Sequence, residues 1–209
     1  MNKGFEMWDN RYAKDTYAYG TKPNLFFKAT IAEYQLNGKM LLPAEGEGRN
    51  AVHAAKEGFE VTAFDISSQG KKKALKLAEK EKVMINYEIG NLFDLKLVDQ
   101  KYDVAALIFA HFPSDVVSIY HHKIADLIID GGIIILEGFS KNHLEMRNIN
   151  PKVGGPNKSE MLFSVESIKK DFTNFEIIKL EEVEVDLNEG EFHNGSGKVI
   201  RFIGRKISN

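Results

Sequence analysis

Cysteine is missing from this chain of 209 residues. Its absence excludes disulfide bonds, thiolate metal sites and cysteine nucleophiles, and it agrees with a reducing compartment. Long apolar runs are missing as well: "VAALIFA" at 104–110 is far too short to span a bilayer, and the first 15 residues hold no secretory apolar segment. The net charge of −2 lacks the basic excess of proteins that bind nucleic acids or anionic membranes. These absences predict a soluble, cytoplasmic protein with neither kind of partner.

What the chain does contain is an alternation of short apolar strands and amphipathic helices. Such alternation is typical of a doubly wound α/β sheet with mostly parallel strands. The segment "YDVAALIFA" is apolar on both faces, which suits a central strand of that sheet. The predicted strands are 39–44, 60–65, 85–90, 102–110 and 131–139, and the predicted helices are 23–35 (opened by Pro23), 50–58, 67–82, 114–129 (with Ser114 as its N-cap) and 164–172.

The C-terminal part follows a different pattern. The strands predicted at 175–187 and 198–206 are joined by ten residues, a connection so short that the two strands must be antiparallel. The stretch 141–161 has no regular pattern and predicts an irregular loop, of the kind that serves as a lid or substrate loop. No linker divides the chain, so we expect one domain, 1–209, in which residues 1–37 form an N-terminal helical flap.

The turn "AEGEG" at 44–48 follows the first predicted strand and opens the next helix. Small residues there allow a ligand to approach the backbone and the unpaired N–H groups of the helix N-terminus. Asp65 ends the next strand, 19 residues after Gly46, where a carboxylate can accept hydrogen bonds from both hydroxyls of a ribose. The pattern therefore favours a ribose-bearing cofactor over a plain tight turn.

Two classes of cofactor fit this layout, a dinucleotide and S-adenosylmethionine. A dinucleotide needs its pyrophosphate on the helix N-terminus. Glu45 and Glu47 stand on either side of Gly46, and the third glycine of the dinucleotide spacing is missing. Carboxylates are poor neighbours for a pyrophosphate and acceptable ones for a sulfonium cation. The turn favours S-adenosylmethionine and leaves an NAD-dependent oxidoreductase as the alternative.

The same residues resemble a known family. "LLPAEGEGRNAVHAAKEGFEVTAFDIS" at 41–67 is similar to the first two strands of class I S-adenosylmethionine-dependent methyltransferases, in their tellurite-resistance-type branch. In that branch the turn continues as Gly-Arg-Asn and is followed by Gly-x-x-Val-x-x-x-Asp-x-Ser, as it does here up to Ser67. Further similar segments, in the same order over nearly the whole chain, are "WDNRYAKDTYAYGTKPN" at 8–24, "AHFP" at 110–113, "GG" at 131–132, "GGP" at 154–156 and "EGEFHNG" at 189–195.

The resemblance implies a fold and a cofactor. The fold is the seven-stranded methyltransferase type, a Rossmann-like sheet that ends in an antiparallel hairpin; the methyl donor is S-adenosylmethionine and the product S-adenosylhomocysteine. The chain departs from the branch at Leu42, usually acidic, at Ala44, usually glycine, and at Asn91, usually acidic, although an amide can still contact adenine. The implied cofactor contacts are Trp8, Tyr19, Ala44, Glu45, Gly46, Glu47, Gly48, Asn50, Asp65, Ile66, Asn91, Leu92 and Ala110.

Three residues are candidates for catalysis: His111, His193 and Arg11. His111 follows the fourth strand, at the sheet edge where ligands of such folds bind, and His193 lies in the last hairpin, which by the resemblance faces the substrate. An unperturbed imidazole can accept a proton near pH 7, although each histidine can equally be structural or exposed. Arg11, like Arg49, can clamp an anion by paired hydrogen bonds. The remaining histidines lack metal-ligand spacing, so no metal site is predicted: His53, His121, His122 and His143.

The sequence thus predicts methyl transfer by in-line displacement to a small-molecule acceptor. A thiol or a chalcogen oxyanion is the acceptor that the resemblance suggests. The aromatic faces of Trp8 and Tyr19 suit a flap near the sulfonium. A module that binds S-adenosylmethionine without turnover is the second alternative, kept open by Leu42 and Ala44. The sequence carries no signal for an oligomeric state.

Overall fold

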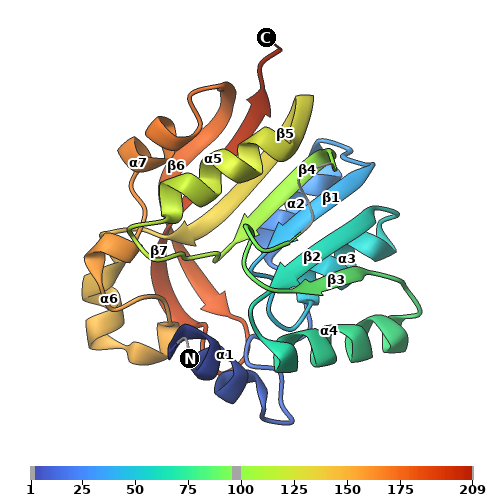
Figure 1. Cartoon of the computed structure of the whole chain (residues 1–209). Helices are drawn as coiled ribbons and strands as arrows, with labels where there is room; N and C mark the ends of the chain where they lie inside the picture. Colours follow the sequence, from blue (N-terminus) through green and yellow to red (C-terminus); the bar gives the residue numbers. More distant parts are fainter. Residues whose placement is uncertain (1–2, 96–99, 209) are drawn as a thin grey trace.

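Seven strands form one mixed sheet in the computed structural model, which describes residues 3–95 and 100–208. The strand order is β3-β2-β1-β4-β5-β7-β6 (Figure 1). The first five strands are parallel, and β7 is antiparallel to both β5 and β6, which confirms the predicted doubly wound sheet with its terminal hairpin. The strands are β1 Lys39–Pro43, β2 Glu60–Asp65, β3 Asn86–Ile89, β4 Tyr102–Ile108, β5 Ile128–Phe139, β6 Phe175–Asn188 and β7 Asn194–Lys206.

Helices cover both faces of the sheet, because successive strand side chains point to opposite faces. Met40 and Leu42 of β1 pack in one cluster with helices α2, α3 and α4, whereas Leu41 packs in another with α5 and α7. No helix within the described ranges is long and apolar enough to cross a membrane. The helices are α1 Lys3–Tyr12, α2 Leu25–Glu33, α3 Arg49–Lys56, α4 Ser68–Glu81, α5 Val117–Leu127, α6 His143–Ile149 and α7 Val165–Asp171, with 3-10 turns η1 Pro151–Val153 and η2 Ser159–Met161.

Local residues explain some of the helix boundaries. Ser67 caps α4 by accepting the backbone N–H of Gly70 at 3.0 Å. Gly58 follows α3 with φ +93°, a left-handed conformation that ends the helix. The prediction that Ser114 caps α5 is wrong. The N-cap of α5 is Val116, whose side chain cannot accept a hydrogen bond. The residues before α5 instead form a turn, which a serine alone does not reveal.

The prediction of an irregular loop at 141–161 is also wrong. These residues form α6, η1 and η2, and they pack against the end of the sheet (Figure 1). His143 is fully buried and stacks on Phe139 of β5 with ring centroids 4.0 Å apart. Val153 is fully buried in the same small cluster, beside Val199 of β7. A helix of seven residues is too short to leave a readable periodicity in the sequence.

Candidate functional site

The carboxyl ends of the parallel strands carry the residues of the candidate site. β1 and β4 are neighbours in the sheet. The strand that follows β1 in sequence, β2, lies on one side of this pair, and the strand that follows β4, β5, lies on the other side. Open α/β sheets bind their ligands at the carboxyl ends of two strands arranged in this way. Ala44, just after β1, has φ +51°, and Phe109, just after β4, has φ +53°. Such left-handed backbone is unfavourable for residues with a side chain and is concentrated at functional sites. The glycine that the methyltransferase branch usually has at position 44 would adopt this conformation without strain.

The turn after β1 is packed so tightly that two of its positions require glycine. Gly48 has φ +86°, and a Cβ atom there would lie 2.5 Å from the Cβ of Ala74 on α4. Gly46 has φ +62°, and a Cβ atom there would lie 2.6 Å from the hydroxyl of Tyr12 on α1. The two glycines therefore bring α3 against α4 and allow the N-terminal helix to lie over the turn.

Asp65 stands beside this turn, as the sequence predicted. Its Oδ2 accepts the backbone N–H of Gly46 at 3.0 Å, and its Oδ1 accepts that of Ser67 at 2.8 Å. Burial raises the pKa of the Asp65 carboxyl to about 6. Each carboxylate oxygen retains an acceptor site beyond these bonds, so the group can also accept hydroxyl donors. The hydroxyl of Tyr87 on β3, a residue that the sequence did not point to, donates a hydrogen bond to the Gly46 carbonyl at 2.6 Å and holds the turn in place.

Glu45 has a structural partner of its own. Its Oε1 accepts the backbone N–H groups of Asn50 and Ala51, both at 2.8 Å, so the carboxylate caps the N-terminus of α3. Burial raises its pKa to about 7, against the effect of these hydrogen bonds. Asn50 in turn accepts the backbone N–H of Asn24 through its Oδ1 at 2.9 Å. Glu45 and Asn50, both predicted to contact the cofactor, therefore make hydrogen bonds within the protein.

The N-terminal segment is held over the site by acidic side chains. Glu47 is buried and accepts the Lys73 ammonium through Oε1 and the backbone N–H of Ala18 through Oε2, the latter at 2.7 Å. Asp9 of α1 accepts the Ser67 hydroxyl at 2.5 Å and the backbone N–H of Gln69 at 3.1 Å, at the N-terminus of α4. Glu47 therefore anchors the segment that precedes α2, rather than standing free beside the turn.

Arg11 lies between two aromatic rings near this segment. The carbon of its guanidinium is 4.9 Å from the ring centroid of Trp8 and 4.5 Å from that of Phe192. Its Nη1 donates to the hydroxyl of Tyr19 at 2.8 Å, and Trp8 stacks on Tyr12 at 5.5 Å. The structure thus brings together Trp8, Arg11 and Tyr19, which the sequence analysis named separately. Within the described residues, the other guanidinium N–H groups have no hydrogen-bond partner.

His111 has no free ring nitrogen. Its Nε2 accepts the backbone N–H of Phe139 at 3.0 Å, so the proton is on Nδ1, which donates to the Met161 carbonyl at 2.9 Å. The ring also stacks on Phe163 at 4.7 Å, and burial lowers its pKa to about 4. A general base needs an available lone pair. The predicted catalytic role of His111 is therefore corrected: it ties η2 to the end of β5.

His193 has a different arrangement. It lies in the hairpin turn, residues 189–193 between β6 and β7, and its Nδ1 is 3.0 Å from Oε2 of Glu189. The same oxygen accepts Nη2 of Arg49 at 2.8 Å. The ring of His193 lies 4.5 Å from Tyr19 and 4.4 Å from Phe109, centroid to centroid. Its Nε2 has no hydrogen-bond partner in the described part of the chain, so this nitrogen is available to accept a hydrogen bond or a proton from a ligand.

The remaining predicted cofactor contacts differ in how far they are buried. Ile66, just after β2, is half-buried. Asn91 accepts the backbone N–H of Phe93 at 2.9 Å through its side-chain oxygen, so it shapes the turn after β3. Leu92 is fully buried in the core and Ala110 is buried after β4. Of these four, only Ile66 and Asn91 keep exposed surface.

A buried polar network that the sequence analysis missed connects the site to β5. Glu137 is 1% exposed, accepts Nδ2 of Asn24 at 2.7 Å and accepts Nε of Arg201 at 2.6 Å. Asn24 also caps α2 and donates to Glu189 at 3.3 Å. A single carboxylate near the end of the apolar strand "GGIIILEGF" was the available signal. Within the described residues, no group of histidines and carboxylates could hold a metal ion.

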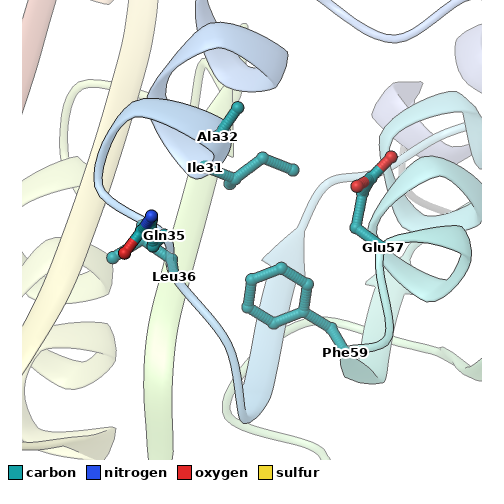
Figure 2. Close-up of a pocket in the computed structure, with 6 residues that line it drawn as sticks. All are labelled: Ile31, Ala32, Gln35, Leu36, Glu57 and Phe59. Atoms are coloured by element: carbon teal, nitrogen blue, oxygen red, sulfur yellow. The ribbon is translucent and has the colours of Figure 1, made fainter.

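The pocket in Figure 2 belongs to another part of the molecule. It has a volume of about 220 Å³ and lies between the end of α2 and the turn before β2, with Ile31 and Phe59 on two sides of it. Phe59 directly precedes β2, so the pocket lies at the amino ends of the strands. It therefore takes no part in the candidate site, which lies at the carboxyl ends.

Comparison with known proteins agrees with this geometry. Residues 43–132 match a family model described as a methyltransferase domain. No curated protein sequence matches the chain significantly. Among solved structures, one reported for the conversion of a disulfide bond into a thioacetal group during echinomycin biosynthesis has a TM-score of 0.80 at 17% identity, covering 98% of this chain and 92% of its own.

Two further structures share the fold. TehB from Haemophilus influenzae has a TM-score of 0.69 at 16% identity, over 97% of this chain and 66% of its own. Magnesium protoporphyrin IX methyltransferase from Synechocystis, solved with bound S-adenosylhomocysteine, has a TM-score of 0.68 at 17% identity, over 98% and 95%. At these identities the likeness establishes the fold, which is that of class I methyltransferases.

Proposed function

We propose that this chain, an S-adenosylmethionine-dependent methyltransferase, transfers the methyl group to a small-molecule acceptor bound between the turn after β1 and the hairpin turn. The observation that carries the proposal is the pairing of Asp65 with Gly46 at the carboxyl edge of the sheet, 3.0 Å apart. It brings a hydroxyl acceptor and a side-chain-free backbone together where β1 and β4 diverge.

The residues present fit the cofactor. Asp65 would accept the ribose hydroxyls through its remaining lone pairs, and Gly46 and Gly48 would leave the backbone open to the rest of the ligand. Ile66 and Asn91 would border the adenine. Bound S-adenosylmethionine supplies an activated methyl group on a sulfonium cation. The protein's own task is to align the acceptor with that carbon, which in the best intramolecular models is worth on the order of 7–11 kcal/mol.

The proposed acceptor region is aromatic. Tyr19 and Phe109 flank His193, and α1 covers the same end of the molecule (Figure 1). These rings favour a compact acceptor over a macromolecule. Within that class we propose a soft nucleophile, a thiol or a chalcogen oxyanion, as the tellurite-resistance-type resemblance suggests. Arg11, with donors to spare, would bind an anionic group of either.

His193 is the proposed general base for acceptors that carry a proton at neutral pH. Its Nε2 is available, whereas both nitrogens of His111 are engaged. Residues 1–37 would act as the flap and 141–161 as the lid of the acceptor site within one domain, 1–209. Exclusion of water by these segments would protect the charged donor from hydrolysis. A cytoplasmic location remains a prediction from the composition.

Calorimetric titration tests the cofactor site. We expect S-adenosylhomocysteine to bind the protein with micromolar affinity and NAD not to bind. In Asp65→Ala, two hydrogen bonds to a charged acceptor are lost, each worth about 1.5–3 kcal/mol, so the affinity should fall at least about 100-fold. Asp126→Ala, an exposed position on α5, is the control and should bind as the parent does. Binding of NAD alone would contradict the proposal.

Acceptor screening tests the reaction. Thiophenol, 2-mercaptoethanol, selenite and tellurite are incubated with protein and S-adenosylmethionine, and formation of S-adenosylhomocysteine is measured. Turnover with one thiol or oxyanion, lost in His193→Gln for the protonated acceptors, supports the proposal. Tight cofactor binding without turnover on a broad panel of small molecules would instead favour the non-catalytic binding module.

A further inference from the structure

Two side chains stand behind His193, on the side away from its free nitrogen: Arg49, which is buried, and Glu189, which is half-buried. Glu189 accepts from Nδ1 of His193 at 3.0 Å, and Arg49 donates to the same carboxylate oxygen at 2.8 Å. The side chains of Arg49 and Glu189 are 8% and 12% exposed. The second carboxylate oxygen of Glu189 accepts Nδ2 of Asn24 at 3.3 Å. Both oxygens are thus held by groups from α3, the N-cap of α2 and the hairpin turn.

We infer that Glu189 is a positioning residue for His193: it holds the imidazole proton on Nδ1, so that Nε2 offers its lone pair to the acceptor. The inference rests on the proposed function, in which His193 is the base. The tautomer of a histidine is decided by the hydrogen bond that one of its nitrogens makes. A carboxylate only accepts, so it selects the tautomer with the proton on Nδ1.

Arg49 has a part in the same arrangement. It is the first residue of α3 and directly follows Gly48, so the turn after β1 places its guanidinium under the hairpin. Burial opposes ionisation of Glu189, but the hydrogen bonds and charges of His193 and Arg49 outweigh it and lower the pKa of Glu189 to about 2. Glu189 is therefore a carboxylate near neutral pH, where it can hold the tautomer of His193.

The groups around His193 keep it neutral near pH 7. Burial lowers its pKa, Glu189 raises it, and the charges of Arg49 and Arg11 lower it. The other titratable groups that face it are the hydroxyl of Tyr19 and the ring of His111. A neutral imidazole with a free Nε2 is the form that accepts a proton.

The proton step balances without another reactant. The acceptor's S–H, Se–H or O–H bond breaks, and its proton goes to Nε2 of His193. The electron pair left on the acceptor atom forms the bond to the methyl carbon. The old bond from that carbon to the sulfonium breaks with its electrons going to sulfur, which leaves neutral S-adenosylhomocysteine. The protonated imidazole is then an ion pair with Glu189 until it releases the proton to water.

The tautomer can be measured directly. Long-range ¹H–¹⁵N spectra of the labelled, ligand-free protein report which imidazole nitrogens carry a proton, and His193→Gln assigns the signals. We expect a protonated Nδ1 and an unprotonated Nε2 in the parent. In Glu189→Gln the amide can donate to Nδ1, and we expect the proton to move wholly or partly to Nε2. The control is Glu191→Gln, an exposed glutamate of the same hairpin turn whose partner Lys14 is also exposed, and it should leave the spectrum unchanged.

Turnover gives the second readout, with 2-mercaptoethanol as the acceptor, because this alkyl thiol keeps its proton at neutral pH. We expect Glu189→Gln to lower kcat at least about tenfold, as loss of an orienting partner does, and to shift the acidic limb of the pH–rate profile to lower pH. A structural role alone would not move that limb. Glu191→Gln should have the parent profile.

The outcomes separate the inference from the proposed function. If the parent protein carries the His193 proton on Nε2, the inference is overturned, and this result needs no variant to fold. If Glu189→Gln leaves both the tautomer and the pH profile as in the parent, the inference also fails. If the tautomer moves but His193→Gln turns over as the parent does, the positioning by Glu189 stands and the role of His193 as base is overturned.

Discussion

Replacing Gly48 by alanine should destabilise the protein in a way that tests the packing of the turn after β1. The backbone there has φ +86°, and the new Cβ would lie 2.5 Å from the Cβ and 2.7 Å from the Cα of Ala74. An alanine in left-handed backbone costs about 1–2 kcal/mol. Forcing a methyl group into a packed contact costs about 1–3 kcal/mol more. The expected loss is therefore about 2–5 kcal/mol.

Gly58→Ala is a matched control at the other end of α3. Its φ is +93°, but a Cβ there would meet no atom within 4 Å, so only the backbone cost of about 1–2 kcal/mol applies. For a chain of this size 1 kcal/mol corresponds to about 2–4 °C in Tm. Urea unfolding of both variants should give a difference of about 1–3 kcal/mol. Affinity for S-adenosylhomocysteine should fall only in Gly48→Ala. Equal loss of stability in the two variants would refute the described contact between α3 and α4.

Three other perturbations have defined outcomes. Because the pKa of Asp65 is raised to about 6 and only its carboxylate accepts both hydroxyls, affinity for S-adenosylhomocysteine should fall about tenfold per pH unit below that pKa, as calorimetry can measure. Asp171→Ala removes the partner of the fully buried His121, 2.7 Å away, and should cost about 3 kcal/mol in urea unfolding, with Lys170→Ala as the exposed control. Tyr87→Phe, which removes the 2.6 Å hydrogen bond to the Gly46 carbonyl, should cost about 1 kcal/mol of stability and weaken cofactor binding.

The sheet was predictable because the features that identify its strands lie within short stretches of sequence. Buried parallel strands are continuous apolar runs, and Asp65 and Gly58 ended their elements where the sequence predicted. The short terminal connection dictated an antiparallel pair by length alone. Boundaries that depend on tertiary contacts were missed. β5 begins at Ile128 rather than 131, and the last two strands extend toward each other until Asn188 pairs with Asn194.

The site was predictable only where one short stretch contained it. Asp65 ends β2 and Gly46 lies 19 residues earlier, in the turn after the adjoining strand β1, and a spacing rule connects them. Glu189 and Arg49 are 140 residues apart, and His111 meets Met161 across 50 residues. No periodicity records which of many charged residues meet across such separations. The sequence therefore named His111 and His193 alike, and only their hydrogen bonds distinguish a held ring from an available one.

Glu45 and Glu47 of "AEGEG" disfavour a pyrophosphate through contacts other than the predicted ones. The sequence predicted that both carboxylates stand beside the ligand, where they would repel a pyrophosphate. Glu47 instead pairs with Lys73, so it contributes little charge to the site. Glu45 occupies the two N–H groups at the N-terminus of α3, at 2.8 Å each. Dinucleotides need that position for their pyrophosphate. The carboxylate therefore disfavours them by filling their anion site, and a cofactor without phosphate has no need to displace it.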